Sequence, residues 1–309
     1  MKPAPGGRLF RGLTSSAAVA FAAVIALLLV VDLLYILAFL ARSSAGEASG
    51  FWRELLGGGD WAAVLGGQTV RELLLSLGSA TVTTLLALVL AVPAGYALSR
   101  HRIPGKVVVD TFVDAAIVLP PLIMGVSLLV LFSALRRTGE ALGTPPDALT
   151  GEPGRPNFLV QWLYDFFVYQ RPGIVLAQFL VGTALAIRAM RAAFDAADRR
   201  VEDVALTLGC SRFGAFWRAA LPQTWSGVLA GGVMCWSYSV GLFAPVQIFA
   251  GAIEGRTRVL PTRTFLEITV GHLELALALT LIMAGIAMAV LICLKFALRR
   301  PAGTGGPVS

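Results

Sequence analysis

The chain has 309 residues, of which 57% are hydrophobic and only 14% are charged, and its mean hydropathy is +0.78. A soluble domain carries about a quarter charged residues, so this composition excludes an ordinary soluble protein and indicates an all-α integral membrane protein. The net charge of +7 does not point to nucleic acid, because the basic residues are dispersed around apolar runs, as at the flanks of membrane spans.

The N-terminal part contains the first predicted transmembrane helix. Residues 1–16 are short, polar and basic, and residues 17–40 form an apolar run of 24 residues. At roughly 1.5 Å per residue such a run crosses a hydrocarbon core of about 30 Å. The apolar part of a cleaved signal peptide is only about 7–15 residues long, so we expect this segment to be retained. Asp32 interrupts the run and is expected near its outer end, close to water.

The second span is predicted at about residues 72–98 and carries a stripe of small residues at helical spacing. Such a stripe favours close packing between membrane helices, and lining of a transport pathway is the alternative. Pro93 is expected to kink this helix. The stripe consists of Ser76, Ser79, Ala80, Thr83, Thr84 and Ala87.

The third span, at about 107–135, contains two consecutive prolines, Pro120 and Pro121. Prolines in mid-span free backbone carbonyls, which a membrane tolerates only where protein or a wet cavity satisfies them. Residues 120–127, with Gly125 and Ser127, are therefore a candidate break that lines a translocation path, and a structural kink is the alternative.

The remaining chain alternates between outer segments and spans. Residues 143–156 are rich in Pro and Gly and are expected to be irregular. Residues 157–169 are apolar and aromatic but too short to span, so they predict an interfacial helix, with a re-entrant segment as the alternative. The other predicted spans lie at about 173–190, 225–250 and 274–298, with an outer loop at 251–273 and a polar tail at 301–309.

Six spans place both termini on one side of the membrane. That side carries 15 Lys and Arg residues and the opposite side carries 10. Because cytoplasmic loops are enriched in basic residues, we expect both termini and the segment 191–222 to be cytoplasmic.

The segment 198–222 is the longest polar interruption on this side, and it predicts two short amphipathic helices hinged at Gly209. Gly209 suits a helix C-cap with positive φ, Ser211 can cap the second helix, and Pro222 can begin a new one. Two amphipathic helices between membrane spans are a docking device for a soluble partner. Their apolar stripes are Val201, Val204, Ala205 and Leu208 in the first helix and Phe213, Phe216, Trp217 and Ala220 in the second.

No catalytic or metal-binding pattern accompanies this segment. The sequence contains no GxSxG, HExxH, P-loop or CxxC motif, and its two histidines, His101 and His272, are expected on opposite sides of the membrane. Ionisable groups are nearly absent from the middle of the spans, which argues against a proton- or ion-coupled transporter. The energy for transport must then come from a partner. The three cysteines, Cys210, Cys235 and Cys293, have no paired spacing.

The segment also resembles the EAA loop of the permease subunits of binding-protein-dependent ABC importers. That loop has a Glu-Ala-Ala opening, a Gly six residues after the Glu and a Leu-Pro some twelve residues later. Here Asp203-Val204-Ala205 is followed by Gly209 and then by Leu221-Pro222. Asp203 replaces the usual Glu and Val204 the first Ala, while Glu202 provides a second acid.

The resemblance implies the type I ABC importer permease fold, with six transmembrane helices. In this fold residues 17–40 form a peripheral first helix, residues 72–298 form the core, and residues 191–222 form the coupling loop. The chain is most similar to the molybdate, tungstate and sulfate branch, through residues 118–125, 173–178, 249–251, 255–257 and 260–261. Many of these permeases have Gly-Glu-Phe-Gly in span five, where this chain has Gly241-Leu242-Phe243-Ala244.

The resemblance further implies a non-catalytic subunit of the bacterial or archaeal inner membrane, with no cofactor of its own. A second permease copy, two ABC ATPase subunits that use ATP and Mg, and an extracytoplasmic solute-binding protein are the expected partners. The expected coupling residues are Glu202, Asp203, Ala205, Leu208, Gly209, Ser211, Phe216, Trp217 and Pro222, with Phe216 and Trp217 packing the loop against the helix ends. The expected path residues are Pro120, Pro121, Gly125, Ser127 and Gly241.

The identity of the cargo is left open by the sequence. Arg256, Arg258 and Arg263 in the outer loop suit an oxyanion, and salt bridges to a docked binding protein are the alternative. Import of another solute, such as thiamine, iron or a polyamine, is an alternative within the same fold. A membrane scaffold or sensor that does not transport is the alternative from a different class.

Overall fold

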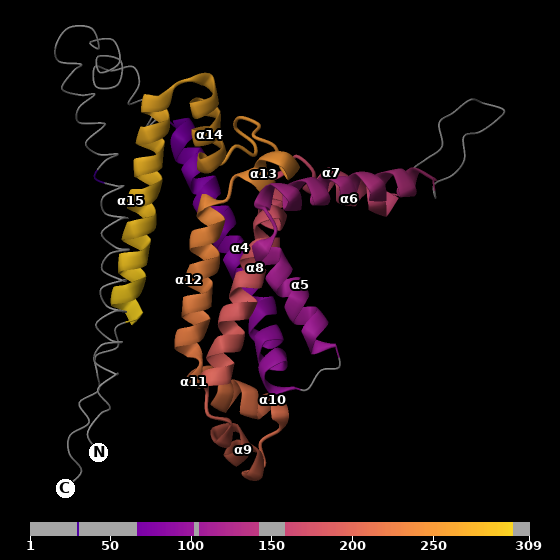
Figure 1. The fold of residues 1–309 in the computed structure, drawn as a ribbon, viewed down its shortest axis with the longest axis vertical. Helices are drawn as coiled ribbons and strands as arrows, with labels where there is room; N and C mark the ends of the chain where they lie inside the picture. The colour runs from indigo at the N-terminus through magenta and orange to yellow at the C-terminus, as the bar shows by residue number, and fades with distance from the viewer. Residues whose placement is uncertain (1–29, 31–66, 102–104, 142–157, 299–309) are drawn as a thin grey trace, which may run out of the picture.

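The computed structural model describes residues 67–101, 105–141 and 158–298, together with residue 30, and every regular element in these ranges is a helix (Figure 1). The predicted span 17–40 with Asp32, the tails 1–16 and 301–309, and the segment 143–156 lie outside the described residues, apart from Val30. Most of the long helices run roughly along one axis, the helix at residues 121–141 lies across it, and short helices gather at both ends (Figure 1).

Three helices form the centre of the bundle: α4 (Gly67–Arg100), α8 (Arg171–Ala196) and α12 (Trp225–Gly241). All six members of the small-residue stripe on α4 are buried, so the stripe packs helices together, as the first of its two interpretations predicted. A cluster of fully buried side chains joins the three helices toward the C-terminal end of α4, and it includes Ala87, Ala91, Ala186, Met190, Phe194 and Cys235.

A buried glutamine links the same three helices. The Thr83 hydroxyl donates to Oε1 of Gln178 at 3.0 Å, and Nε2 of Gln178 donates to the carbonyl oxygen of Ser239 at 3.0 Å. Gln178 is 1% exposed, so both ends of its amide depend on these bonds. An unsatisfied amide in an apolar interior costs several kcal/mol, and the network therefore specifies how α4, α8 and α12 align.

Helix α4 approaches α8 most closely at Gly95. A Cβ atom at this position would lie 2.5 Å from Cβ of Met190 and 2.9 Å from the backbone nitrogen of Arg191. Backbone atoms cannot move aside as a flexible side chain can, so the crossing depends on the absence of a side chain at Gly95.

The predicted third span is divided into two helices, α5 (Lys106–Val118) and α6 (Pro121–Ala141), which run in clearly different directions (Figure 1). Leu119 between them is extended, with φ −62° and ψ 135°. A residue that precedes proline is disfavoured in the α-region, and both Leu119 and Pro120 precede one. The break therefore lies at residues 119–120, while most of the expected break at 120–127 is helical because Pro121 opens α6.

The predicted fifth span is interrupted as well. Helix α12 ends at Gly241, Leu242 is extended with ψ 115°, and the short helix α13 (Ala244–Phe249) follows with Pro245 in its first turn. This break coincides with the Gly241–Ala244 stretch that departs from the family pattern.

Two shorter helices and one long helix complete the described structure. The apolar segment after residue 157 forms α7 (Phe158–Phe167), and the predicted outer loop contains an unexpected helix, α14 (Leu260–Val270). Thr262 begins α14 by accepting from the backbone nitrogen of Val259 at 3.0 Å, and Gly271 ends it with φ +95°. Helix α15 (Leu273–Leu298) then runs beside α12 (Figure 1).

Three described helices are long and apolar enough to cross a membrane, namely α4, residues 121–140 of α6, and α8. Helix α12 has 17 residues, fewer than the roughly 20 that a straight span requires. The apolar core of α15 covers Leu275–Val290. The count of six spans stays a prediction.

Because α4 and α8 are so close at Gly95, a single methyl group added there is predicted to lower the stability of the protein, whereas one added at an open position of α4 is not. We expect Gly95→Ala to lower the stability of the detergent-solubilised protein, because overpacking costs about 1–3 kcal/mol. Gly78 in the same helix is the matched control, since a Cβ atom there meets nothing within 4 Å. Gly78→Ala should keep or raise the melting temperature, since Ala is favoured over Gly in helices by about 1 kcal/mol. Equal melting temperatures for the two variants would contradict this account of the crossing.

Candidate functional site

The segment 198–223 forms a compact group of short helices at the end of the bundle where α4 and α8 end (Figure 1). It comprises α9 (Arg199–Thr207), α10 (Arg212–Ala215), a π-helical turn (Phe216–Ala220) and α11 (Leu221–Gln223). As predicted, Gly209 separates the two amphipathic parts with φ +88°, and Pro222 lies in the first turn of α11.

Local capping explains why α9 and α10 begin where they do. The carboxylate of Asp198 accepts from the backbone nitrogen of Arg200 at 3.0 Å, and the Ser211 hydroxyl accepts from that of Gly214 at 3.1 Å. Each bond satisfies a backbone donor that has no partner within its helix. The role expected for Ser211 as a cap is therefore confirmed by its geometry.

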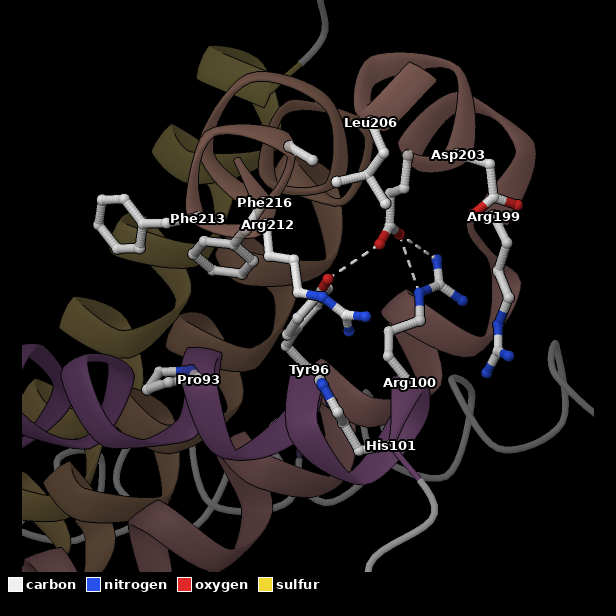
Figure 2. A pocket seen from close by; sticks show the side chains of 12 residues that line it. Pro93, Tyr96, Arg100, His101, Arg199, Asp203, Leu206, Arg212, Phe213 and Phe216 are labelled. Carbon is white, nitrogen blue, oxygen red and sulfur yellow. Dashed lines mark hydrogen bonds and ion pairs between the residues drawn. The ribbon is translucent and has the colours of Figure 1, made fainter. Parts of the chain in front are cut away.

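A buried ion pair attaches α9 to the end of α4. The carboxylate of Glu202 accepts from Nε of Arg100 at 2.9 Å, lies 2.7 Å from Nη2 of Arg100, and accepts from the Tyr96 hydroxyl at 3.0 Å. Tyr96 and Arg100 thus converge on one carboxylate (Figure 2). Side-chain exposure is 10% for Glu202 and 7% for Arg100, so the charges are shielded from water and neutralise each other.

Aromatic packing reinforces this attachment. The Phe216 ring lies edge-on to Tyr96 of α4, with centroids 4.8 Å apart, and also contacts Phe194 of α8. Phe216 therefore packs the loop against both helix ends, as expected. The same expectation is wrong for Trp217, which is 53% exposed. Among the ring contacts of the described residues, its ring contacts only those of Phe213 and Phe216. Neighbouring residues in a helix point about 100° apart, so both rings cannot face the bundle.

The apolar stripe of α9 faces away from the bundle. Val201, Val204 and Leu208 are 45%, 55% and 79% exposed, whereas the buried residue of this helix is Glu202. Asp203 is exposed beside the stripe, and Ala205 is half-buried. An amphipathic helix usually turns its apolar side inward. An outward apolar surface, continued by Phe213 at 72% exposure, is the kind of patch that marks a protein contact.

A cavity of about 470 Å³ lies between the end of α4 and the helices α9 and α10 (Figure 2). Its polar lining includes Arg199, Arg212 and Asp203, in addition to the Arg100–Glu202 pair. Within the described ranges there is no group of His, Cys, Asp and Glu side chains that could hold a metal ion. The charged pair at this cavity holds α9 against α4.

The expected path residues are distributed over the two helix breaks. Gly125 of α6 is buried, and a Cβ atom there would lie 2.6 Å from Cα of Pro245, so α6 and α13 touch at this point. Pro120, Ser127 and Gly241 are exposed and Pro121 is half-buried. The structure therefore brings Gly125 against α13 and leaves Pro120, Ser127 and Gly241 open at the surface.

At the opposite end of the bundle, a buried carboxylate ties α4 to α14. Glu72 accepts from Nε of Arg258 at 2.6 Å and from Nη1 of Arg263 at 3.2 Å, and it is 4% exposed. Glu254 and Glu267 lie 3.3 and 3.6 Å from the same two arginines. Of the three arginines expected to suit an oxyanion or a docked protein, Arg258 and Arg263 are thus paired within the chain. Arg256 is exposed, and its Nε donates to Oε1 of Gln170 at 3.2 Å.

Sequence reasoning missed both buried carboxylates as structural links. Glu202 was expected to couple to a partner, and Glu72 only marked the beginning of a span. One sequence signal could have indicated these ion pairs. It is an acidic residue in a helical turn close to a membrane span, with arginines elsewhere on the same side of the membrane. It does not say which arginine is the partner.

Comparison with known proteins places this geometry in context. Residues 84–300 match the family model described as binding-protein-dependent transport system inner membrane component. The chain is 30% identical over 210 residues to the molybdenum transport system permease protein ModB of Escherichia coli, covering 67% of this chain and 79% of that protein. It is also 30% identical over 246 residues to ModB of Mycobacterium tuberculosis, covering 79% and 84%.

Two further similarities extend this comparison. Over 175 residues the chain is 33% identical to the molybdate/tungstate transport system permease protein WtpB of Thermococcus kodakarensis, covering 57% of this chain and 58% of that protein. A crystal structure of a bacterial alginate ABC transporter, with its periplasmic protein, contains a similar chain. The TM-score is 0.62 at 14% identity, and the match covers 95% of this chain and 98% of that one.

The buried pair predicts strong coupling between Arg100 and Glu202 in a double-mutant cycle. Arg100→Ala and Glu202→Ala should each lower the free energy of unfolding in detergent by about 3–5 kcal/mol, because each leaves a buried charge unpaired. The double variant should lose clearly less than the sum of the two. Asp203→Ala is the control, because this neighbouring acid is exposed and its loss should change stability by less than about 0.5 kcal/mol. Additive losses would show that the two side chains act independently.

Proposed function

Since the chain belongs to the inner-membrane components of binding-protein-dependent transport systems, and so is the permease subunit of an ABC importer, we propose that it carries an oxyanion of the molybdate and tungstate class into the cell. The single observation that carries the mechanism is the outward apolar face of α9. It offers a contact surface for a soluble partner, while Glu202 holds the same helix on the bundle.

The partner in this proposal is an ABC ATPase subunit that docks on the apolar face. Val204 and Leu208 enter a groove of the ATPase, and Asp203 pairs with a basic residue at its rim. Phe213 and Trp217, also exposed, widen the contact. ATP and Mg are used by that subunit, and this chain supplies no catalytic group.

Motion passes from the docking surface into the membrane helices through two sets of contacts. The Glu202–Arg100 pair and the Glu202–Tyr96 hydrogen bond join α9 to α4, and the Phe216 ring joins the π-helical turn to α4 and α8. When ATP binding closes the ATPases, displacement of α9 then moves the ends of α4 and α8 as one unit. Hydrolysis resets them.

The pore in this proposal is formed by two copies of the chain, each with six spans and cytoplasmic termini. Discontinuous membrane helices commonly line transport sites, because their free backbone groups face a polar cavity. The breaks at residues 119–120 and 242–243 support such a path, since the helices that follow them touch where Gly125 meets Pro245. An extracytoplasmic binding protein delivers the cargo at the α14 end.

The choice of an oxyanion rests on the relatives named for molybdate and tungstate transport. Sulfate, thiamine, iron or a polyamine is the alternative cargo of the same fold. The paired state of Arg258 and Arg263 means that selection does not depend on these two arginines, and we assign it to the binding protein.

The docking proposal predicts loss of ATPase binding without loss of folding. Leu208→Glu should abolish co-purification of the ATPase subunit, because a charge would enter an apolar contact, and it should leave the melting temperature unchanged because Leu208 is 79% exposed. Asp203→Arg should retain folding and lose substrate-stimulated ATP hydrolysis. Thr207→Glu, an exposed neighbour on the flank of the stripe, is the matched control and should retain the ATPase.

A second matched pair of variants tests the hinge at Gly209 in the same assay. Gly209→Trp should reduce stimulated hydrolysis and uptake. Gly105→Trp carries the same backbone strain, since both glycines have positive φ and open space around them, but it lies outside the coupling segment. Unchanged transport in Leu208→Glu, Asp203→Arg and Gly209→Trp together would overturn the coupling role of this segment.

The cargo is tested by uptake in proteoliposomes that contain the permease, its ATPase and the cognate binding protein. Radiolabelled molybdate and tungstate should be accumulated in an ATP-dependent manner and should compete with each other. Sulfate in excess should compete weakly. Uptake of thiamine, ferric iron or a polyamine with no molybdate uptake would refute the cargo while leaving the importer assignment intact.

A further inference from the structure

An apolar groove runs along one side of the bundle between α4, α7 and α8. It has a volume of about 690 Å³, within the range of ligand pockets, and Arg171 at one end is its one ionisable lining residue. Its floor and walls are formed by Leu74, Val82, Leu86, Phe166, Val175 and Phe179, among others.

The length of the groove matches one leaflet of a bilayer. Its lining on α4 extends from Leu74 to Leu86, and twelve residues of helix rise by about 18 Å. Half of a hydrocarbon core is about 15 Å thick. Leu74, Val82 and Leu86 are 63%, 48% and 49% exposed, so the groove is open along this length.

The Arg171 end of the groove continues into a second, polar cavity. This cavity has a volume of about 380 Å³ and shares Leu74, Leu75 and Arg171 with the groove, and it is also lined by Gln68, Arg71, Glu72 and Arg258. The apolar groove therefore adjoins a polar cavity that is lined by three arginines and one carboxylate.

The charge of this polar cavity is positive after its internal pairs are counted. Glu72 is already bound by Arg258 and Arg263, so its charge is cancelled. Among the described residues no carboxylate pairs with Arg71 or Arg171 within 4 Å, and Nε of Arg171 is held by the carbonyl oxygen of Arg256 at 3.2 Å. Two guanidinium groups thus remain for an anion, and one of them is oriented by the backbone.

From this juxtaposition we propose that the groove binds one anionic phospholipid. Its phosphate lies between Arg71 and Arg171, and one acyl chain lies along α4 as far as Leu86. The amphipathic form of the site fits this class of ligand, since a basic pocket beside an apolar membrane groove is how lipid head groups are recognised. The inference uses the membrane placement of α4 and α8 and is independent of the cargo and of the ATPase contact.

The test uses the purified permease complex in nanodiscs of phosphatidylcholine with a minority of phosphatidylglycerol, followed by native mass spectrometry. The wild-type complex should retain about one phosphatidylglycerol per permease chain. Arg71→Gln/Arg171→Gln should reduce this retention about tenfold, because both head-group contacts are lost. Arg137→Gln, an exposed arginine of α6 that lines neither cavity, is the control for charge.

A second variant tests the acyl-chain part of the site without touching the arginines. Gly78 lines the groove and a Cβ atom there meets nothing within 4 Å, so Gly78→Phe should fill the groove and displace the lipid. Gly285→Phe in α15 is the matched control, because Gly285 is also exposed with nothing within 4 Å and lies outside the groove.

Three other results would each overturn the proposal that a phospholipid occupies the groove. Equal retention in all variants means that the lipid is not bound here. Loss of the permease dimer in Gly78→Phe means that a second copy covers the groove. A disulfide formed by Gly78→Cys with a cysteine introduced into residues 17–40 means that the first span of the chain covers it.

Discussion

The structure depends on one buried carboxylate at the end of the bundle that carries the short helices of residues 198–223. Glu202 takes the place that an apolar residue of an amphipathic helix would normally occupy, and it meets Arg100 and Tyr96 there. A buried charge is stable only when it is paired and hydrogen-bonded, so α9 has one orientation on α4. That orientation turns Val204 and Leu208 outward. The polar residue holds the helix, and the apolar residues are exposed.

The other end of the bundle repeats this device. Glu72 joins the first turns of α4 to α14 through Arg258 and Arg263, so both ends of one helix are tied by ionic contacts. Between them, small residues and the amide of Gln178 hold α4 against α8 and α12. Helix α4 is therefore fixed by ionic contacts at both ends and by close packing between them, and it connects the segment 198–223 to α14.

Two helices of the bundle are interrupted, at residues 119–120 and 242–243. Leu119 and Leu242 are both extended, and each break is followed by a helix with proline in its first turn. The first break follows from the conformation that proline imposes on the residue before it, because Leu119 and Pro120 each precede a proline. The extended Leu242 of the second break lies three residues before Pro245, so this rule does not account for it. The contact between Gly125 and Pro245 joins α6 to α13, the helices that follow the two breaks, although they are far apart in sequence.

The sequence by itself determined the elements that depend on local chemistry or composition. The membrane class, the small-residue stripe of α4, the glycine hinge, the Ser211 cap and the proline break all follow from residues that interact with near neighbours in the chain. Only the tertiary structure decided which face of α9 is buried, that Trp217 points outward, and that Arg258 and Arg263 are already paired. These outcomes depend on Arg100, on the Tyr96 ring against Phe216 and on Glu72, which lie about a hundred or more residues away from their partners. Periodicity carries no information about such distant partners.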